Sequence, residues 1–353
     1  MGFDIGGSNT KVAFINVENG CIKNLITRTV YLPMWKNSEK LSATLRKLAE
    51  EVGKSKHIEL ITITMTAELS DAYGTKSEGV QDILRQTESA FPNVSILVVD
   101  VNGELKTLAE ARAQSLSVAA ANWVATGWLI SQLYKNCVVI DVGSTTTSII
   151  PIANGIVTAK GKTDLEKLIL GELVYTGSLR TNVAAITNVI PVKNCFARVS
   201  SEFFAQSADV HLILGNITEE QYTVESSDGR ERTRKESLAR LARVVCADTD
   251  MLTEQEIFQI AQYVCTQQIN QIAAALIQIR DCLKKIGAHN DFAIITGLGK
   301  NFLAGKAASQ AGFSKIIDFG ELVNNDVARV STAFAVALMG ASYLQGSLVN
   351  WMQ

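Results

Sequence analysis

Short apolar stretches alternate with segments of helical periodicity along the chain. Continuous apolar runs, such as 60–66 and 137–140, predict buried strands. Between them, apolar residues recur every three to four positions, which predicts helices that cover the strands. An alternation of strands and helices is typical of a mainly parallel sheet with helices on its faces. The pattern therefore predicts an α/β protein.

The predicted elements divide the chain into two halves. After an N-terminal hairpin, the first half predicts helix 38–53, strand 60–66, helix 79–90, strand 95–100 and an Ala-rich helix at 108–133. The second half opens at 137 and predicts helices 236–247 and 254–286, strands 291–296 and 315–319, and a final helix at 326–344. The predicted domains are 1–134 with 326–353, and 135–325 with an insertion at about 180–235 that has its own strand at 210–214.

A short motif occurs twice, about half a chain apart. Residues 4–11 read Asp-Ile-Gly-Gly-Ser-Asn-Thr-Lys, and residues 141–148 read Asp-Val-Gly-Ser-Thr-Thr-Thr-Ser. Each motif is followed by a β-rich run and then by Asn-Gly, at 19–20 and at 154–155. Asn-Gly between apolar runs is a strong hairpin signal, because both residues tolerate positive φ. The sequence therefore predicts the same strand, turn, strand and hairpin in both halves.

The repeated motif suits a phosphate clamp. Small residues let backbone N–H groups approach an anion, hydroxyl groups add donors, and a lysine adds a point charge. The residues expected to contact phosphate are Gly6, Gly7, Ser8, Asn9, Thr10, Lys11, Gly143, Ser144, Thr145 and Thr146. The carboxylates of Asp4 and Asp141 can orient a hydrated divalent cation, and Mg²⁺ is the expected ion. An ordinary β-turn explains either copy alone, whereas the duplication favours the clamp.

Composition narrows the class of partner. The 33 basic and 35 acidic residues give a formal net charge of −2, which predicts neither a nucleic-acid partner nor an anionic membrane surface. Hydrophobic residues make up 47% of the chain, which excludes a largely disordered protein. Six scattered cysteines without a C-x-x-C pair and three isolated histidines argue against zinc and disulfides. These features predict a cytoplasmic protein with small-molecule partners; self-association is left open.

Several motifs resemble known families. Asp-Ile-Gly-Gly at 4, Asp-Val-Gly-Ser-Thr-Thr-Thr at 141 and Gly-Leu-Gly at 297 are similar to the phosphate-1, phosphate-2 and nucleoside-side motifs of the actin, sugar-kinase and Hsp70 superfamily, near hydantoinase A. Other segments are similar to an archaeal-type family that includes the methanofuran-biosynthesis synthase. They are 64–71 (TMTAELSD), 122–123, 171–177, 180–181, 228–230 and 240–248. Only three residues precede Asp4, so the first strand is expected to be shorter than in that family.

The resemblance implies both a fold and a reaction. The fold is a pair of ribonuclease-H-like domains, of the actin-like ATPase type, that flank a central cleft, with an inserted α/β segment in the second half. The reaction joins 5-(aminomethyl)furan-3-ylmethyl diphosphate to the phenol of γ-glutamyltyramine and releases diphosphate. Gly297 and Gly299 then lie on the phosphate side of the site.

Such a reaction needs a proton acceptor, because the phenol has a reference pKa near ~10. Glu68 is the first candidate, since it follows an apolar strand at a position that faces the cleft in this fold; Asp71 and Glu172 come second. A helix-capping or salt-bridging carboxylate is the equal alternative for Glu68. Binding of the acceptor substrate is expected at three residues that also suit a packed hinge: Tyr175, Thr176 and Arg180.

Two other functions remain open at this point. The same clamp could bind the phosphates of ATP in a small-molecule kinase or ATPase, with ATP as a cofactor under that alternative only. A nucleotide-dependent scaffold or chaperone-like protein of the actin or Hsp70 kind is the second alternative. It is less favoured, because no substrate-binding domain follows the two halves.

Overall fold

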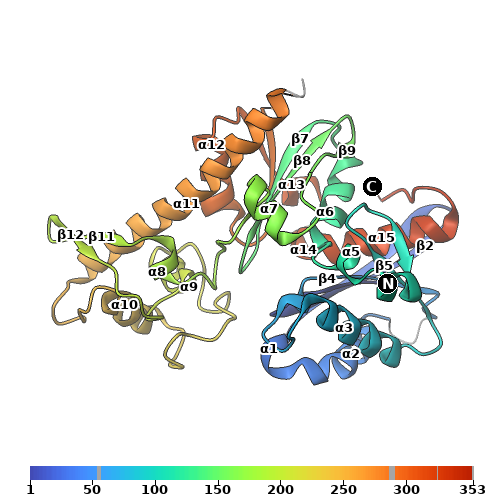
Figure 1. Ribbon diagram of the computed structural model, residues 1–353, viewed down its shortest axis with the longest axis horizontal. Helices are drawn as coiled ribbons and strands as arrows, with labels where there is room; N and C mark the ends of the chain where they lie inside the picture. Colours follow the sequence, from blue (N-terminus) through green and yellow to red (C-terminus); the bar gives the residue numbers. More distant parts are fainter. Residues whose placement is uncertain (54–56, 286–290, 324, 352–353) are drawn as a thin grey trace. The chain divides into compact units, whose positions relative to one another are not determined.

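The computed structural model describes residues 1–53, 57–285, 291–323 and 325–351. The chain divides into two compact units (Figure 1). Unit 1 contains Met1–Lys135, Ile152–Glu166 and Leu322–Gln353, and unit 2 contains Asn136–Pro151 and Lys167–Glu321. Within the described residues, no helix is both long enough and apolar enough to cross a membrane. All six cysteines are free thiols.

The sheet of unit 1 has six strands in the order β3-β2-β1-β4-β5-β6. The strands are β1 (Gly2–Ile5), β2 (Asn9–Glu18), β3 (Cys21–Tyr31), β4 (Leu60–Met65), β5 (Ser95–Val99) and β6 (Leu105–Thr107). Strands β1, β2 and β3 pair antiparallel, whereas β1, β4 and β5 pair parallel. The Asn19-Gly20 hairpin between β2 and β3 has positive φ at both residues, as the sequence predicts.

The second sheet repeats this order as β10-β8-β7-β13-β14, with β9 also paired to β8. Its strands are β7 (Cys137–Val142), β8 (Thr147–Ala153), β9 (Ile156–Val157), β10 (Leu173–Val174), β13 (Phe292–Thr296) and β14 (Lys315–Asp318). Strands β7, β13 and β14 pair parallel, as β1, β4 and β5 do in unit 1. The Asn154-Gly155 hairpin again has positive φ at both residues. The predicted α/β fold with two related halves is therefore confirmed. A third, two-stranded sheet pairs β11 (Val189–Val192) with β12 (Cys195–Arg198).

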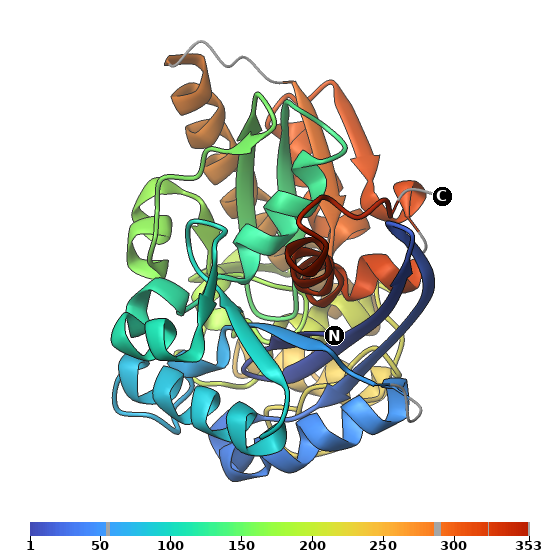
Figure 2. The same ribbon diagram turned by 90° about the vertical axis from the view of Figure 1, so that its right-hand side faces the viewer.

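The helices of unit 1 are α1 (Met34–Asn37), α2 (Leu41–Gly53), α3 (Lys76–Ala90), α4 (Leu108–Ala113), α5 (Ser115–Val118), α6 (Asn122–Ser131), α14 (Asn325–Arg329) and α15 (Ser331–Gln345), with short turns η1 (Ser38–Lys40) and η2 (Ala67–Leu69). Helix α15 lies against β1, β2 and β4 (Figure 2). A Cβ atom on Gly2 would lie 2.3 Å from the Ala333 oxygen, so only glycine lets α15 approach β1 this closely.

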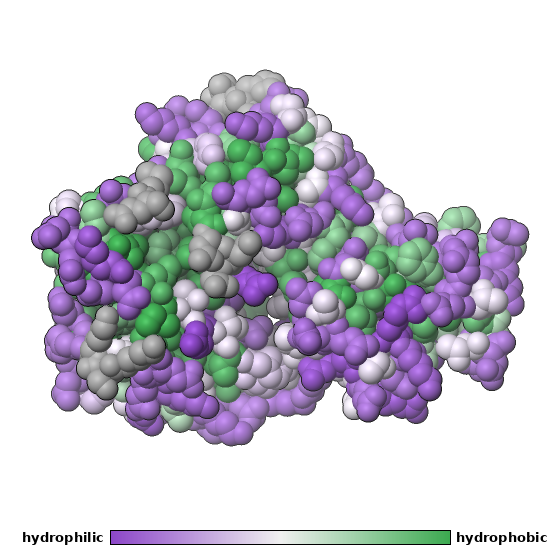
Figure 3. Space-filling model, turned by 180° about the vertical axis from the view of Figure 1, so that it is seen from behind, coloured by the Kyte–Doolittle hydropathy of each residue, from purple (hydrophilic) through white to green (hydrophobic). Residues whose placement is uncertain are grey.

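Unit 2 is built around one long helix, α11 (Glu254–Lys285), whose apolar face lines the core. The other helices are α8 (Val183–Ile186), α9 (Ser207–Ile213), α10 (Arg234–Arg243), α12 (Gly305–Gln310) and α13 (Phe319–Leu322), with the π-turn η3 (Lys300–Ala304). The short helix α7 (Asp164–Leu170) continues from unit 1 into unit 2. On the face drawn in Figure 3, hydrophilic residues cover most of the surface between smaller apolar patches.

Three features of the sequence prediction differ from the structure. The predicted helix at 108–133 is broken twice: Gln114, with φ of −126° and ψ of 56°, separates α4 from α5, and Ala120, with φ of 50°, separates α5 from α6. The predicted strand at 210–214 lies mostly in α9, where the side chains of Gln206 and Asp209 cap the helix start. Residues 152–166 group with unit 1, in which the Gly155 amide donates to the Lys135 oxygen. Residue 286, the predicted end of the helix that begins at 254, lies outside the described residues.

Candidate functional site

The two copies of the motif fold into the same tight turn. The Gly6 amide donates to the Asn9 oxygen at 3.0 Å, and the Gly143 amide donates to the Thr146 oxygen at 2.9 Å. In both copies the donor lies two residues after the aspartate and the acceptor five residues after it. The sequence repeat is therefore also a repeat of hydrogen-bond geometry. The turns are called turn 1 (residues 6–9) and turn 2 (residues 143–146) below.

Asp4 is the penultimate residue of β1 and lies buried beside turn 1. It pairs in register with Lys11 of β2 and with Thr64 of β4, so the three side chains share one face of the sheet. Lys11 Nζ lies 3.3 Å from Asp4 Oδ2. The buried atoms Asp4 Oδ1 and Thr64 Oγ1 have no hydrogen-bond partner within the described residues. Buried polar atoms are rarely left in this state, so the spot suits an ion, water or ligand atom.

The carbonyl groups of turn 1 are directed to the segment that precedes α1. The Gly7 oxygen accepts from the Met34 amide and the Ser8 oxygen accepts from the Leu32 amide, both at 2.9 Å. These oxygens are thereby held in place by protein donors, which reduces repulsion of a bound anion. Thr10 pairs in register with Ile5, so its side chain points to the face of the sheet opposite to Asp4.

Turn 2 is held in the same way by the segment that follows β10. The Gly143 oxygen accepts from the Ser178 amide, and the Ser144 oxygen accepts from the amides of Leu179 and Arg180. Gly177 crosses the turn so closely that a Cβ atom there would lie 2.6 Å from the Thr145 carbonyl carbon. Turn 2 therefore depends on a neighbouring backbone that has no room for a side chain.

The predicted Gly-Leu-Gly loop lies against the strand that leads into turn 2. The Gly299 amide donates to the Val142 oxygen at 3.0 Å. Gly297 has φ of 86°, and a Cβ atom there would lie 2.6 Å from Asp141 Oδ1. Asp141 pairs in register with Thr296, whose buried hydroxyl has no hydrogen-bond partner within the described residues. The Asp–Thr pair across two parallel strands in unit 1 thus recurs in unit 2.

A buried chain of hydrogen bonds holds residues 176–177, the segment that crosses turn 2. Gln268 of α11 is fully buried and donates to Thr176 Oγ1 at 2.7 Å and to the Gly177 oxygen at 3.0 Å. Its amide oxygen lies 3.0 Å from His211 Nε2 of α9. Burial lowers the pKa of His211 from 6.5 to about 3, so this histidine is neutral at pH 7 and serves as a structural partner.

Glu68 lies in η2, directly after β4, and its side chain is completely buried. Neither carboxylate oxygen has a hydrogen-bond partner within the described residues, and Lys76 Nζ lies 3.9 Å from Oε1. Burial raises the pKa of Glu68 from 4.5 to about 7. Lys76 also forms a close ion pair with Asp164 at the start of α7. A buried carboxylate that titrates near neutrality suits proton transfer.

The remaining predicted residues lie in other environments. Asp71 is exposed. Glu172 is buried, with its Oε2 atom 3.8 Å from Lys167 Nζ, which is typical of an internal ion pair. Thr176 is buried by its contact with Gln268, whereas Tyr175 is 56% exposed. Glu68 remains the leading candidate proton acceptor, because its side chain is buried and burial raises its pKa to about 7.

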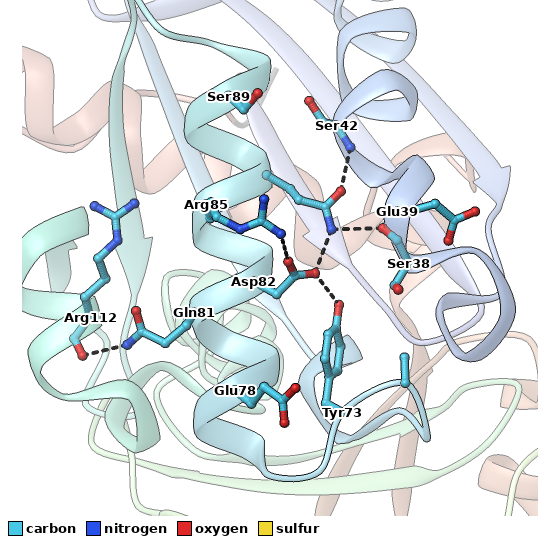
Figure 4. Close-up of a pocket in the computed structure, with 12 residues that line it drawn as sticks. Ser38, Glu39, Ser42, Tyr73, Glu78, Gln81, Asp82, Arg85, Ser89 and Arg112 are labelled. Atoms are coloured by element: carbon cyan, nitrogen blue, oxygen red, sulfur yellow. Dashed lines mark hydrogen bonds and ion pairs between the residues drawn. The ribbon is translucent and has the colours of Figure 1, made fainter.

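A polar hollow of about 860 Å³ lies elsewhere in unit 1, between α2, α3 and α4 (Figure 4). Its side chains bind one another: Asp82 accepts from Tyr73 Oη at 2.9 Å and from Gln86 Nε2 at 2.7 Å, and it pairs with Arg85. Gln86 Nε2 also donates to the Ser38 oxygen. The bond to Ser38 ties η1 to α3, and none of the predicted site residues lines this hollow.

Sequence reasoning missed several residues that build the site. Thr64 and Thr296 are recognisable as polar residues in otherwise apolar strands, but their pairing with an aspartate depends on strand register. Gly177 carries a weak signal, as a glycine in a polar segment. Gln268 and Lys76 look like ordinary polar positions of helices, and no sequence signal marks them.

Comparison with known proteins finds one matching family and two relatives of similar sequence. The chain matches the hydantoinase/oxoprolinase family over residues 59–338. It is 38% identical over 338 residues to the (4-{4-[2-(γ-L-glutamylamino)ethyl]phenoxymethyl}furan-2-yl)methanamine synthase of Methanocaldococcus jannaschii, which covers 96% of each chain. The synthase of the same name from Methanococcus vannielii is 36% identical over 216 residues, which are 61% of this chain and 95% of the relative.

Solved structures that resemble this chain have lower sequence identity to it than these two synthases. An acetone carboxylase, described as an ATP-dependent enzyme in its nucleotide-free form, has 16% sequence identity and a TM-score of 0.49. The match covers 87% of this chain but only 46% of that chain, so this protein spans less than half of the carboxylase chain. A ROK family glucokinase from Streptomyces griseus, in complex with glucose and AMPPNP, has 12% identity and a TM-score of 0.46 over 97% of this chain and 98% of its own.

Proposed function

Since this chain belongs to the family of (4-{4-[2-(γ-L-glutamylamino)ethyl]phenoxymethyl}furan-2-yl)methanamine synthases, we propose that it catalyses the transferase step that this name describes. The substrates are 5-(aminomethyl)furan-3-ylmethyl diphosphate and γ-glutamyltyramine, and the pathway is methanofuran biosynthesis. The observation that carries the proposal is the duplicated turn, with an aspartate before each copy and the same internal hydrogen bond in each. Family membership as a synthase argues against a non-catalytic scaffold.

The chemistry requires one bond to form and one to break. The phenol oxygen of the acceptor attacks the furanylmethyl carbon, and the bond from that carbon to the diphosphate oxygen breaks. The furan ring delocalises positive charge at the departing methylene, so no covalent bond to the enzyme is needed. The phenolic proton passes to a base, and diphosphate takes the electron pair of the broken bond. The protein therefore has to stabilise the leaving anion and accept one proton.

The turns supply the groups that a leaving diphosphate needs. Their small residues allow close approach of backbone amides, and the carbonyls of turn 1 and turn 2 are held by other segments. Ser8, Ser144 and Thr145 add hydroxyl donors beside these amides. Donors fixed in place before the reaction stabilise developing negative charge without reorganisation. This supports diphosphate, rather than a neutral group, as the ligand of the turns.

The residues beside the turns fit a hydrated Mg²⁺ ion. Mg²⁺ keeps several waters and is bound through one or two carboxylates together with substrate phosphates. Asp4 Oδ1 is buried without a hydrogen-bond partner within the described residues, and Asp141 occupies the equivalent position in unit 2. In the part of the chain that the structure describes, no group of three or more His, Cys, Asp or Glu residues could hold a metal by itself. When bound with substrate, Mg²⁺ would neutralise charge on the leaving diphosphate.

Glu68 is the proposed proton acceptor. Its burial keeps the pKa of the carboxyl near 7, so a substantial fraction is ionised at neutral pH and can take the phenolic proton.

The cytoplasm is the proposed compartment, consistent with six free cysteines.

An ATP-dependent kinase or ATPase is the second candidate, because the loop around Gly297 and Gly299 lies against the strand before turn 2. The test incubates the purified protein with Mg²⁺, furanylmethyl diphosphate and γ-glutamyltyramine in the absence of nucleotide. Equal amounts of diphosphate and aryl ether are expected. Product that forms only after ATP is added, together with ADP, would overturn the synthase proposal.

Two variants test the role of the turns in the same assay. Asp4→Asn and Asp141→Asn should each lower turnover at least ~10²-fold, the scale of losing one electrostatic element of a site. Asp281→Asn is the matched control, because this aspartate is exposed on α11 and forms a surface ion pair with Lys284 at 3.6 Å. Near-normal turnover of both Asp4→Asn and Asp141→Asn would show that the strand-end carboxylates do not act on the diphosphate.

A further inference from the structure

We infer that Lys76 and Asp164 are positioning residues that act on Glu68 in opposite directions and so set how readily this carboxylate accepts the substrate proton. The inference rests on the proposed function, in which Glu68 is the proton acceptor. Lys76 begins α3, and Asp164 begins α7, which brings together residues 88 positions apart in the chain. All three residues belong to unit 1.

Glu68 is enclosed by the start of α3. Gly79 of α3 packs so tightly that a Cβ atom there would lie 2.5 Å from the Glu68 oxygen and 2.7 Å from its Cα atom. This contact holds η2 against α3 and leaves the Glu68 carboxylate facing Lys76. Lys76 and Asp164 are 24% and 23% exposed, whereas the Glu68 side chain is 0% exposed. Glu68 is therefore the buried member of the three, and Lys76 and Asp164 are both partly exposed.

Lys76 is shared unequally between two carboxylates. Its Nζ atom is 3.9 Å from Glu68 Oε1 but forms a close hydrogen bond with Asp164 Oδ2. Asp164 thus draws the ammonium group away from Glu68. Tyr73, the nearby titratable residue in the loop before α3, is engaged elsewhere, because its hydroxyl donates to Asp82. Among the described residues, Lys76 and Asp164 are charged groups that act on the Glu68 carboxylate.

The effects on the pKa of Glu68 follow from this geometry. Burial is the largest effect and raises the pKa to about 7, Lys76 lowers it, and Asp164 raises it. A simple structural salt bridge would bring the lysine fully onto Glu68 and keep the carboxylate ionised and inert. Here the Asp164 pair withholds part of that stabilisation, which leaves Glu68 able to exchange a proton near neutral pH.

The experiment compares pH–rate profiles of Asp164→Asn and Lys76→Met with those of the unchanged protein. Asp164→Asn should move the acid limb to lower pH and Lys76→Met to higher pH, each by on the order of one pH unit. Lys76→Arg keeps the positive charge and should restore the unchanged profile in most part. Lys47→Met is the control, because Lys47 is exposed on α2 and forms a surface ion pair with Glu51.

A second readout does not depend on turnover. The carboxyl band of Glu68, identified by its loss in Glu68→Gln, is titrated by infrared difference spectroscopy without substrate. Opposite shifts of this titration in Asp164→Asn and Lys76→Met support the inference, even if the protein proves inactive as a synthase. Shifts in the same direction, or unchanged titration in both variants, would overturn it while diphosphate release still tests the proposed function.

Discussion

Gly177 crosses turn 2 at a distance that leaves no room for a side chain. Its φ is not positive, so an alanine there meets no backbone strain, and only the added methyl group matters. That methyl carbon would lie 2.6 Å from the Thr145 carbonyl carbon and 2.8 Å from that of Ser144. Both neighbours are backbone atoms and cannot rotate away. Gly177→Ala therefore tests whether the geometry of turn 2 matters for activity.

The size of the effect follows from the distances. An ordinary contact needs at least 3.4 Å, so the turn and the crossing segment must separate by roughly 0.8 Å. The amides of Ser178 and Leu179 bind the turn carbonyls and oppose this separation. A misplacement of about 1 Å costs on the order of 10²-fold in rate. Overpacking should also lower the free energy of unfolding by about 1–3 kcal/mol.

The assay is diphosphate release at saturating acceptor, together with urea unfolding of the same preparation. We expect Gly177→Ala to lower kcat/KM for the diphosphate substrate about 10²-fold while the protein remains folded. Gly53→Ala is the control, because a methyl group there meets nothing closer than 3.9 Å. Activity of Gly177→Ala within twofold of the unchanged protein would refute the reasoning that this crossing shapes turn 2.

Three further predictions concern buried polar groups. Gln268→Leu removes the donor to Thr176 Oγ1, and should raise KM for the diphosphate and lower the free energy of unfolding by about 1–3 kcal/mol; unchanged KM and unfolding would contradict this. Arg240→Met leaves the buried carboxylate of Asp209 without its 2.8 Å partner, so urea unfolding should show a loss of about 3–5 kcal/mol, and a loss below about 1 kcal/mol would count against it. Above pH 8, Glu68→Gln should exceed the unchanged protein in free energy of unfolding by about 3 kcal/mol. The folded-state pKa of Glu68 is raised from 4.5 to about 7, so the stabilising contribution of the protonated carboxyl group is fully present below pH 4.5 and is lost as the pH rises through 7. A gap between these two proteins that does not shrink from pH 8 to pH 4.5 in thermal unfolding would contradict the assigned pKa.

The sequence predicted the local geometry of the two turns, but it did not predict the long-range contacts around them. The turns after Asp4 and Asp141 close as their residue types predict. Thr10, by contrast, lies on the opposite face of the sheet from Asp4, because its position depends on the register between β1 and β2. Glu68 was the leading candidate base, but its burial and its link to Lys76 are results of packing.

The same difference between local geometry and long-range contacts explains the errors in the predicted fold. The Ala-rich stretch at 108–133 has helical propensity throughout, yet Ala120 is held at φ of 50° between α5 and α6. Residues 210–214 are apolar enough for a strand, but the capping interactions of Asp209 begin a helix there. In both segments tertiary context overrides local propensity, which is a weak determinant of structure.

The sequence by itself determined the repeat, the two Asn-Gly hairpins and the small-residue turns, because these features depend on the φ preferences of neighbouring residues. Only the tertiary structure decided that Thr64 and Thr296 stand beside the aspartates, and that Gly177 crosses turn 2. It also decided that Lys76 reaches both Glu68 and Asp164. These contacts join segments far apart in the chain, and strand register and helix packing select them rather than any local pattern.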